Sequence, residues 1–116
     1  MDFEYFYGEQ QESFSFYRTP KFFYTDAKFR TLSSGAKILY GIMLDRLSLS
    51  AKNGWRDADG KIYIYMTLDS IEEIMGCARQ KAVALLKELN DFGLIEKKRQ
   101  ERYKPTKIYV KNIVGQ

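Results

Sequence analysis

The segment from Thr67 to Asn90 constrains the fold most, because it reads as two short amphipathic helices separated by Gly76. Apolar side chains recur at three- and four-residue steps on both sides of that glycine, as expected for helices that bury one face. Thr67 is a suitable N-cap for the first helix, and Gly93 a suitable C-cap for the second. The apolar positions are Leu68, Ile71, Ile74 and Met75 in the first helix and Ala82, Leu85, Leu86 and Leu89 in the second. The pattern predicts a helix–turn–helix whose second helix covers Ala78–Asn90.

A β-hairpin is predicted directly after the second helix. Two β-prone segments, Leu94–Arg99 and Lys107–Ile113, flank a polar stretch that contains Pro105. A helix–turn–helix followed at once by such a hairpin is a winged helix.

Two further elements are predicted upstream. A helix follows Leu32, capped by Ser33 or Ser34, and its apolar pattern fades in the stretch Ser48–Asn53. The alternating run after it predicts a short β-hairpin that turns on Asp57–Gly60. The expected fold class is therefore α+β, a winged helix–turn–helix with two β-hairpins and an N-terminal aromatic arm.

The N-terminal arm is expected over residues 1–30, and the winged-helix domain over residues 31–116. The arm contains eleven of the eighteen aromatic residues without a helical period, and the alternation around Phe14 and Phe16 suggests a short strand. Exposed aromatic rings would form an apolar patch of the kind that marks an interface. The predicted dimer-interface residues are Phe14, Phe16, Phe22, Phe23 and Tyr24. The alternative is an arm that folds back onto its own domain.

Positive charge is concentrated near the C-terminus. The whole chain has a net charge of +4, but residues 76–111 hold ten Lys or Arg against four Asp or Glu, a net charge of +6. Residues 1–75 carry a net charge of −2. This asymmetry is typical of a surface that binds a polyanion, although a lysine-rich solubilising surface has the same composition.

The second helix of a helix–turn–helix enters the DNA major groove, and its first turns read base edges. On a helical wheel with the leucines inward, Gln80, Ala84 and Lys87 point outward and Lys81 lies on the shoulder. Arg79 is in the first turn, where its long side chain can still reach the exposed face. Arg and Lys suit guanine, Gln suits adenine, and Ala permits close approach. The basic residues predicted to contact DNA from the wing are Lys97, Lys98, Arg99, Arg102, Lys104 and Lys107.

Several function classes are disfavoured by composition. The chain has no histidine and a single cysteine, Cys77, so common metal sites, Ser-His or Cys-His catalytic pairs and internal disulfides are not expected. We expect no cofactor, no metal and no enzymatic activity. No apolar run is long enough for a membrane helix and no signal peptide is visible, so we expect a cytoplasmic protein without a membrane partner.

The motifs AKILYGIMLDRLSLSAKNGW, at Ala36–Trp55, and RQKAVALLKELNDFGLIEKKRQ, at Arg79–Gln100, are much more specific than a generic helix–turn–helix. With FYRTPKFF and IYVKNI, they make the chain from about Phe16 to Ile113 resemble the N-terminal domain of the RepA_N family. These proteins are replication initiators of low-copy plasmids of Gram-positive bacteria, including staphylococcal multiresistance plasmids.

The resemblance implies a winged helix that binds repeated origin sites, called iterons, as a dimer or higher assembly. It places Arg79, Gln80 and Lys81 at the start of the recognition helix. It also implies a separate C-terminal domain that recruits host replication factors and is missing here, so the chain is expected to be an N-terminal fragment. Two alternatives share the local features: a winged-helix transcriptional regulator, and a protein-interaction module that uses the aromatic arm.

Overall fold

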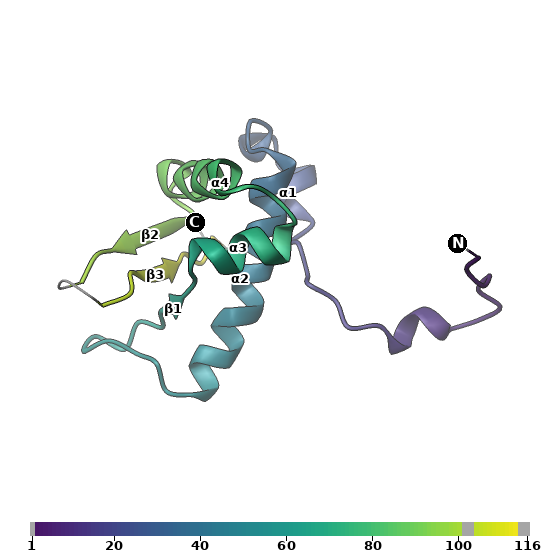
Figure 1. The fold of residues 1–116 in the computed structure, drawn as a ribbon, viewed down its shortest axis with the longest axis horizontal. Coiled ribbons are helices and arrows are strands. Elements are labelled where there is room, and N and C mark those ends of the chain that lie inside the picture. The colour runs from purple at the N-terminus through teal and green to yellow at the C-terminus, as the bar shows by residue number, and fades with distance from the viewer. Residues whose placement is uncertain (1, 101–103, 114–116) are drawn as a thin grey trace.

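The computed structural model describes residues 2–100 and 104–113. Its elements, in chain order, are a 3-10 helix Gln10–Ser13, α1 Phe22–Thr25, a 3-10 helix Ala27–Phe29, α2 Ser34–Lys52, β1 Ile64–Tyr65, α3 Leu68–Met75, α4 Arg79–Phe92, β2 Ile95–Lys98 and β3 Lys107–Val110. Figure 1 shows α2, α3 and α4 packed together, with the sheet beside them. This arrangement confirms the predicted winged-helix fold class.

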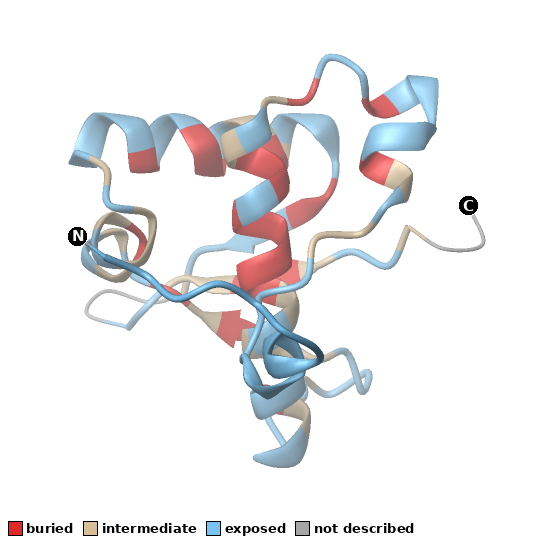
Figure 2. Ribbon diagram, turned by 90° about the vertical axis from the view of Figure 1, so that its right-hand side faces the viewer, coloured by how far each residue is buried: buried red, intermediate tan, exposed pale blue. Residues whose placement is uncertain are grey.

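Helix α2 forms the centre of the domain. The Ser33 hydroxyl accepts a hydrogen bond from the Ala36 N–H at 3.2 Å, which fixes the start of the helix as predicted. Leu39 and Met43 are completely buried, and Figure 2 shows the buried positions concentrated along this helix. The helix continues to Lys52, past the point where its apolar pattern fades, and ends at Asn53. A fully buried stripe along one helix anchors the other elements around it.

The helix–turn–helix is confirmed. The Thr67 hydroxyl accepts from the Ser70 N–H at 3.0 Å and caps α3. Gly76 ends α3 with φ +64°, a left-handed conformation that costs an L-residue energy but suits glycine. Because this turn is so short, α4 starts three residues later at Arg79 and crosses close to α3.

The wing is also confirmed, as the antiparallel pair β2–β3 with Ile95 opposite Val110 and Lys98 opposite Lys107. The first predicted hairpin is much smaller than expected, since a single bridge joins Arg56 to Ile62. Its second arm instead continues into β1, which pairs with β3 and completes a sheet of order β1-β3-β2. Pairing with β3 places Ile64 in the core, which explains why the strand joins the wing.

The first part of the N-terminal segment extends away from the domain, as Figure 1 shows. All side chains of residues 2–18 are exposed. The short strand expected around Phe14 and Phe16 is wrong: this stretch follows a 3-10 helix and pairs with no strand of the described structure. Its alternation has no buried face to stabilise it, because both rings are more than half exposed.

The second part of the segment belongs to the core. Phe23 is 1% exposed, and its ring lies 5.1 Å from that of Phe29 and 5.2 Å from that of Tyr40. The backbone at Arg18 lies close against α2, since a Cβ added at Gly41 of this helix would lie 2.7 Å from the Arg18 carbonyl oxygen. The packed domain therefore begins near residue 18, and the boundary expected at residue 30 does not coincide with a change in packing.

The dimer-interface prediction is corrected accordingly. Phe23 is wrong as an interface residue, because its ring is already buried within its own chain, and Phe22 is half-buried against the same core. Phe14, Phe16 and Tyr24 are 53%, 60% and 63% exposed. The open alternative, an arm that folds back onto its own domain, holds for residues 19–29, while the preceding residues stay outside the core.

Candidate nucleic-acid interface

Helix α4 presents the face that the helical wheel predicts. Its leucines and Ala82 are buried against α2 and α3, and this burial orients the opposite side of the helix toward solvent. All five residues expected on the outer face are exposed: Arg79, Gln80, Lys81, Ala84 and Lys87. The α4 surface is therefore a row of basic and amide side chains around a small alanine, with no helix of the described structure covering it.

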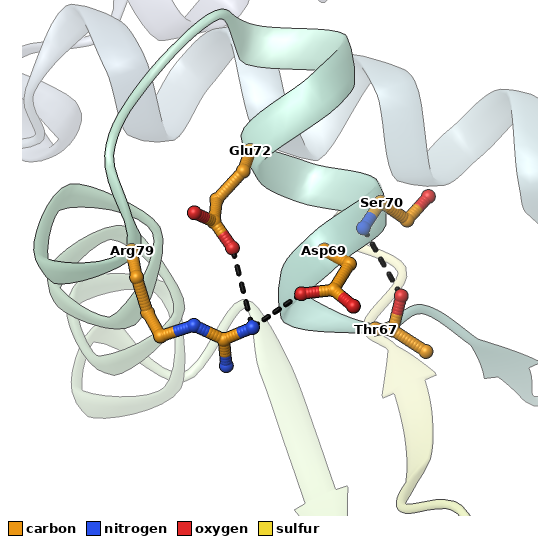
Figure 3. Close-up of polar contacts among 5 residues, drawn as sticks. All are labelled: Thr67, Asp69, Ser70, Glu72 and Arg79. Atoms are coloured by element: carbon orange, nitrogen blue, oxygen red, sulfur yellow. Dashed lines mark hydrogen bonds and ion pairs between the residues drawn. The ribbon is translucent and has the colours of Figure 1, made fainter.

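Arg79, at the first position of α4, is held by two carboxylates of α3 (Figure 3). Its Nη2 donates to Asp69 Oδ1 and lies 3.4 Å from Glu72 Oε2. Asp69 and Glu72 are three residues apart on α3, so they lie on the same face of that helix. The guanidinium is thus restrained at the N-terminal end of the exposed α4 face. Asp69 and Glu72 lie on a different helix from Arg79, so the periodicity of α4 gives no signal for this contact.

The two lysines of α4 differ in their partners. Lys87 Nζ lies 2.6 Å from Asp91 Oδ2, one turn later on the same helix, and this hydrogen bond raises the pKa of Lys87. Lys81 makes no side-chain hydrogen bond or ion pair within the described residues. Of the two, Lys81 therefore offers its charge to a ligand without first giving up an internal partner.

Glu88 has a structural role that sequence reasoning missed. Its carboxylate accepts from both the N–H and the hydroxyl of Ser33, each at 2.6 Å. These bonds join the start of α2 to α4 and stabilise the angle at which α4 presents its outer face. The two partners are 55 residues apart in the sequence, so no local pattern signals this contact.

The wing carries its predicted basic residues at the surface. Lys97, Lys98, Arg99 and Lys104 are exposed and Lys107 is half-buried, whereas Arg102 lies outside the described residues. The register places Lys98 directly opposite Lys107 on neighbouring strands. Like charges in that position destabilise a sheet. Lys98 and Lys107 also line one depression, together with Arg99 and Lys104.

The loop before β1 is organised by Asp57. Its carboxylate accepts from the N–H groups of Asp59 and Lys61 at 2.9 Å and from the Tyr109 hydroxyl at 3.1 Å. This bonding fixes the loop against the wing strand β3.

The stability of this loop is expected to depend on pH. Desolvation alone would raise the pKa of Asp57, but the hydrogen bonds that it accepts lower it below the ordinary value. A carboxyl whose pKa is lowered by folding stabilises the fold fully above its unfolded pKa of about 3.9. That contribution is lost as the pH falls through the lower pKa of the folded state. The amide resonances of Asp59 and Lys61 should report this titration in an NMR series.

The matched variant for that series is Asp57→Asn, which should remove this titration from both amide resonances. A titration at the ordinary aspartate pKa in the unmodified protein would contradict the assignment of the loop.

Two further observations concern residues 2–100 and 104–113. No group of three or more His, Cys, Asp or Glu side chains there could hold a metal ion, and Cys77 is half-buried. None of the helices in this part of the chain is both long and apolar enough to cross a membrane.

Comparison with known protein families shows to which family the chain belongs. Residues 15–116 match the family described as replication initiator protein A (RepA) N-terminus, RepA_N. The chain belongs to this family. A RepA_N assignment agrees with the motifs on α2 and α4, and it covers the helix–turn–helix and the wing together.

The chain is also similar to a known protein and to several solved structures. A 41 kDa protein of Lactobacillus helveticus is 31% identical over 81 residues, covering 70% of this chain and 23% of that protein. The chain thus spans less than a quarter of the length of that relative. A solved structure described as the N-terminal domain of a DNA binding protein has a TM-score of 0.77 at 35% identity, covering 96% of this chain and 85% of that one.

Two further solved structures are similar. One described as a Rep-DNA complex has a TM-score of 0.77 at 36% identity, covering 94% of this chain and 84% of that one. One described as an MDR initiator has a TM-score of 0.74 at 36% identity, covering 94% and 86%.

Proposed function

We propose that this RepA_N domain binds double-stranded DNA at repeated plasmid-origin sites, with α4 in the major groove and the wing on the phosphate backbone. The observation that carries the proposal is the exposed α4 face, whose basic and amide side chains occupy the first turns of the second helix of a winged helix. These are the positions from which such a fold reads base edges. Family membership and the similar Rep-DNA complex support the same role.

The α4 side chains have hydrogen-bonding groups that match the base edges exposed in the major groove. Arg79 and Lys81 can donate to guanine O6 and N7, and the Gln80 amide can pair with adenine N6 and N7. Ala84 leaves room for a base or its methyl group. Four exposed residues within two turns therefore offer different preferences at neighbouring base pairs, which is the basis of sequence-specific binding.

The wing supplies affinity rather than sequence preference. Lys98 and Lys107 are cross-strand partners in the β2–β3 pair, so an anion beside them would meet two positive charges. A phosphate group is the corresponding ligand in a DNA complex.

A homodimer completes the proposal. The exposed rings of Phe6, Phe14 and Phe16 form a chain of contacts with centroid separations of 6.0 and 6.2 Å. Their exposure in one chain supports an interface with a second copy, which would match repeated DNA sites. In the whole initiator, host replication factors would be contacted by a region other than this domain, and the site of action would be the cytoplasm.

The first experiment is selection of duplexes of about 30 base pairs, roughly three helical turns, from a randomised pool with the domain. Fluorescence anisotropy then compares the selected duplex with its scrambled version at about 50 and 200 mM salt. We expect about 100-fold or greater preference for the selected duplex and a steep salt dependence. Equal, weak binding of both duplexes would contradict sequence-specific recognition. A single selected palindrome that is absent from the plasmid origin would favour a transcriptional regulator.

Replacing Lys98 by alanine tests the wing. We expect weaker binding to the selected and scrambled duplexes by the same factor, with the salt slope reduced by about 1, because a phosphate contact does not depend on base identity. The matched control is Lys52→Ala, which removes an exposed lysine from the last residue of α2. A selective loss with the Lys98 variant would instead make Lys98 a base-reading residue.

A further inference from the structure

The contacts of Arg79 with α3 determine which of its guanidinium N–H groups are available to a DNA base. An arginine pairs with guanine through two neighbouring N–H groups, either from Nη1 and Nη2 or from Nε and Nη2, so Nη2 belongs to both edges. In this structure Nη2 donates to Asp69 and also faces Glu72 at 3.4 Å (Figure 3). The atom that every bidentate contact needs is therefore already shared between two carboxylates.

The charges around Arg79 also matter for what can approach it. One guanidinium and two carboxylates sum to −1 at the start of α4, whereas an arginine without these two neighbours would give +1. The Asp69 side chain is 83% exposed and that of Arg79 is 56% exposed, so an incoming ligand meets both. The Glu72 side chain is 28% exposed, so it is less accessible than the other two.

This arrangement affects phosphates and bases differently. A phosphate carries a full negative charge, and the two carboxylates repel it at the distance at which it would meet Arg79. The O6 and N7 edge of guanine is polar but neutral, so the same carboxylates repel it much less. A neutral edge also engages two N–H groups of the guanidinium together. The carboxylates therefore disfavour backbone contacts by Arg79 more than contacts to guanine.

We propose that Asp69 and Glu72 are specificity-determining residues, which restrain Arg79 and so suppress binding of DNA that offers it only phosphate. They are positioning residues that act through Arg79 and need not touch DNA. This inference rests on the proposed function, because it concerns the same α4 face. It describes selection against the wrong ligand, in which discrimination comes from repulsion as well as from attraction.

The experiment compares Asp69→Asn and Glu72→Gln with the unmodified domain on the selected and scrambled duplexes. An exposed ion pair contributes at most about 1 kcal/mol, which corresponds to about a fivefold change in binding. We expect each variant to bind the scrambled duplex about two- to fivefold more tightly, with a smaller gain for the selected duplex. Discrimination between the two duplexes then falls. Circular dichroism melting identifies any variant that does not fold, and the other variant then carries the test.

The matched control is Glu73→Gln. Glu73 is exposed on the same helix and makes no hydrogen bond or ion pair with Arg79. This variant removes the same charge and should change affinity for both duplexes equally, leaving discrimination intact. In an Arg79→Ala background, Asp69→Asn should likewise no longer alter discrimination, because the residue through which it acts is gone.

Three results would overturn the inference. Equal gains for both duplexes, or the same loss of discrimination with Glu73→Gln, would show that the change in binding comes from the net charge of the domain and not from the restraint of Arg79. Weaker binding of the selected duplex alone would mean that Asp69 orients Arg79 toward its base instead of restraining it. Failure of the proposed function is distinct, since it shows as a lack of discrimination by the unmodified domain.

Discussion

Phe23→Ala is expected to destabilise the domain by about 3–5 kcal/mol, the range for removing a fully buried phenylalanine. The ring is 1% exposed and contacts Phe29 and Tyr40 in edge-to-face geometry, with centroids 5.1 and 5.2 Å away. Its loss leaves a cavity between α1 and α2 and removes favourable aromatic contacts as well as apolar burial. A domain of this size has a total stability of about 5–15 kcal/mol, so the variant would be only marginally folded.

Urea unfolding at several protein concentrations measures the effect and separates it from dimerisation. The control is Phe16→Ala, whose ring is 60% exposed and which should change monomer stability by no more than about 0.5 kcal/mol. The Phe23 effect should be the same at every concentration, because its ring is buried within one chain. If the Phe23 variant lost stability only at concentrations that favour a dimer, its ring would lie in the interface after all. In the proposed homodimer, Phe16→Ala instead lowers the concentration dependence.

Local signals made the helix–turn–helix predictable. Thr67 and Ser33 accept the hydrogen bonds expected of N-caps, and Gly76 has the left-handed conformation expected of a C-cap. Each of these contacts joins residues three or four positions apart, so composition and spacing carry the information. The outer face of α4 was predictable for the same reason, since the helical period alone separates Gln80, Ala84 and Lys87 from the buried leucines.

Long-range packing was not predictable from the same patterns. The aromatic residues of 1–30 lack a period, and nothing local distinguishes exposed Phe16 from buried Phe23. Burial of Phe23 depends on Tyr40 in α2, which lies far along the sequence. The pairing of β1 with β3, instead of with its neighbour across the turn, also depends on where the core lies.

The same limit applies to the candidate site. The first-turn position of Arg79 predicts that its long side chain reaches the surface, but its restraint by Asp69 comes from the crossing of α3 and α4. Similarly, Glu88 binds Ser33 because α2 and α4 pack side by side. Sequence therefore predicts which side chains are presented, whereas the contacts that tune them come from tertiary structure.

Arg79→Ala is expected to weaken binding of the selected duplex by about 1–3 kcal/mol, or roughly 5- to 150-fold, if Arg79 reads a base. Binding of the scrambled duplex should weaken less, because the restrained guanidinium contributes little to phosphate contacts and only the loss of its charge affects that duplex. Competition anisotropy with both duplexes measures the two changes together. An unchanged affinity for the selected duplex would show that Arg79 does not read a base.

The alanine variant has a second effect that must be separated from the first. It leaves Asp69 and Glu72 without their partner, and their unbalanced charges then repel all DNA. The double variant Arg79→Ala/Asp69→Asn removes part of that repulsion, so the loss of selected-duplex binding that persists in it belongs to the missing base contact. Arg79→Lys gives the complementary test, because lysine keeps the charge but lacks the planar fork that pairs with guanine. It should retain binding of the scrambled duplex and lose preference for the selected one. This outcome is expected only if the geometry of the guanidinium, and not its charge alone, is needed to read the base.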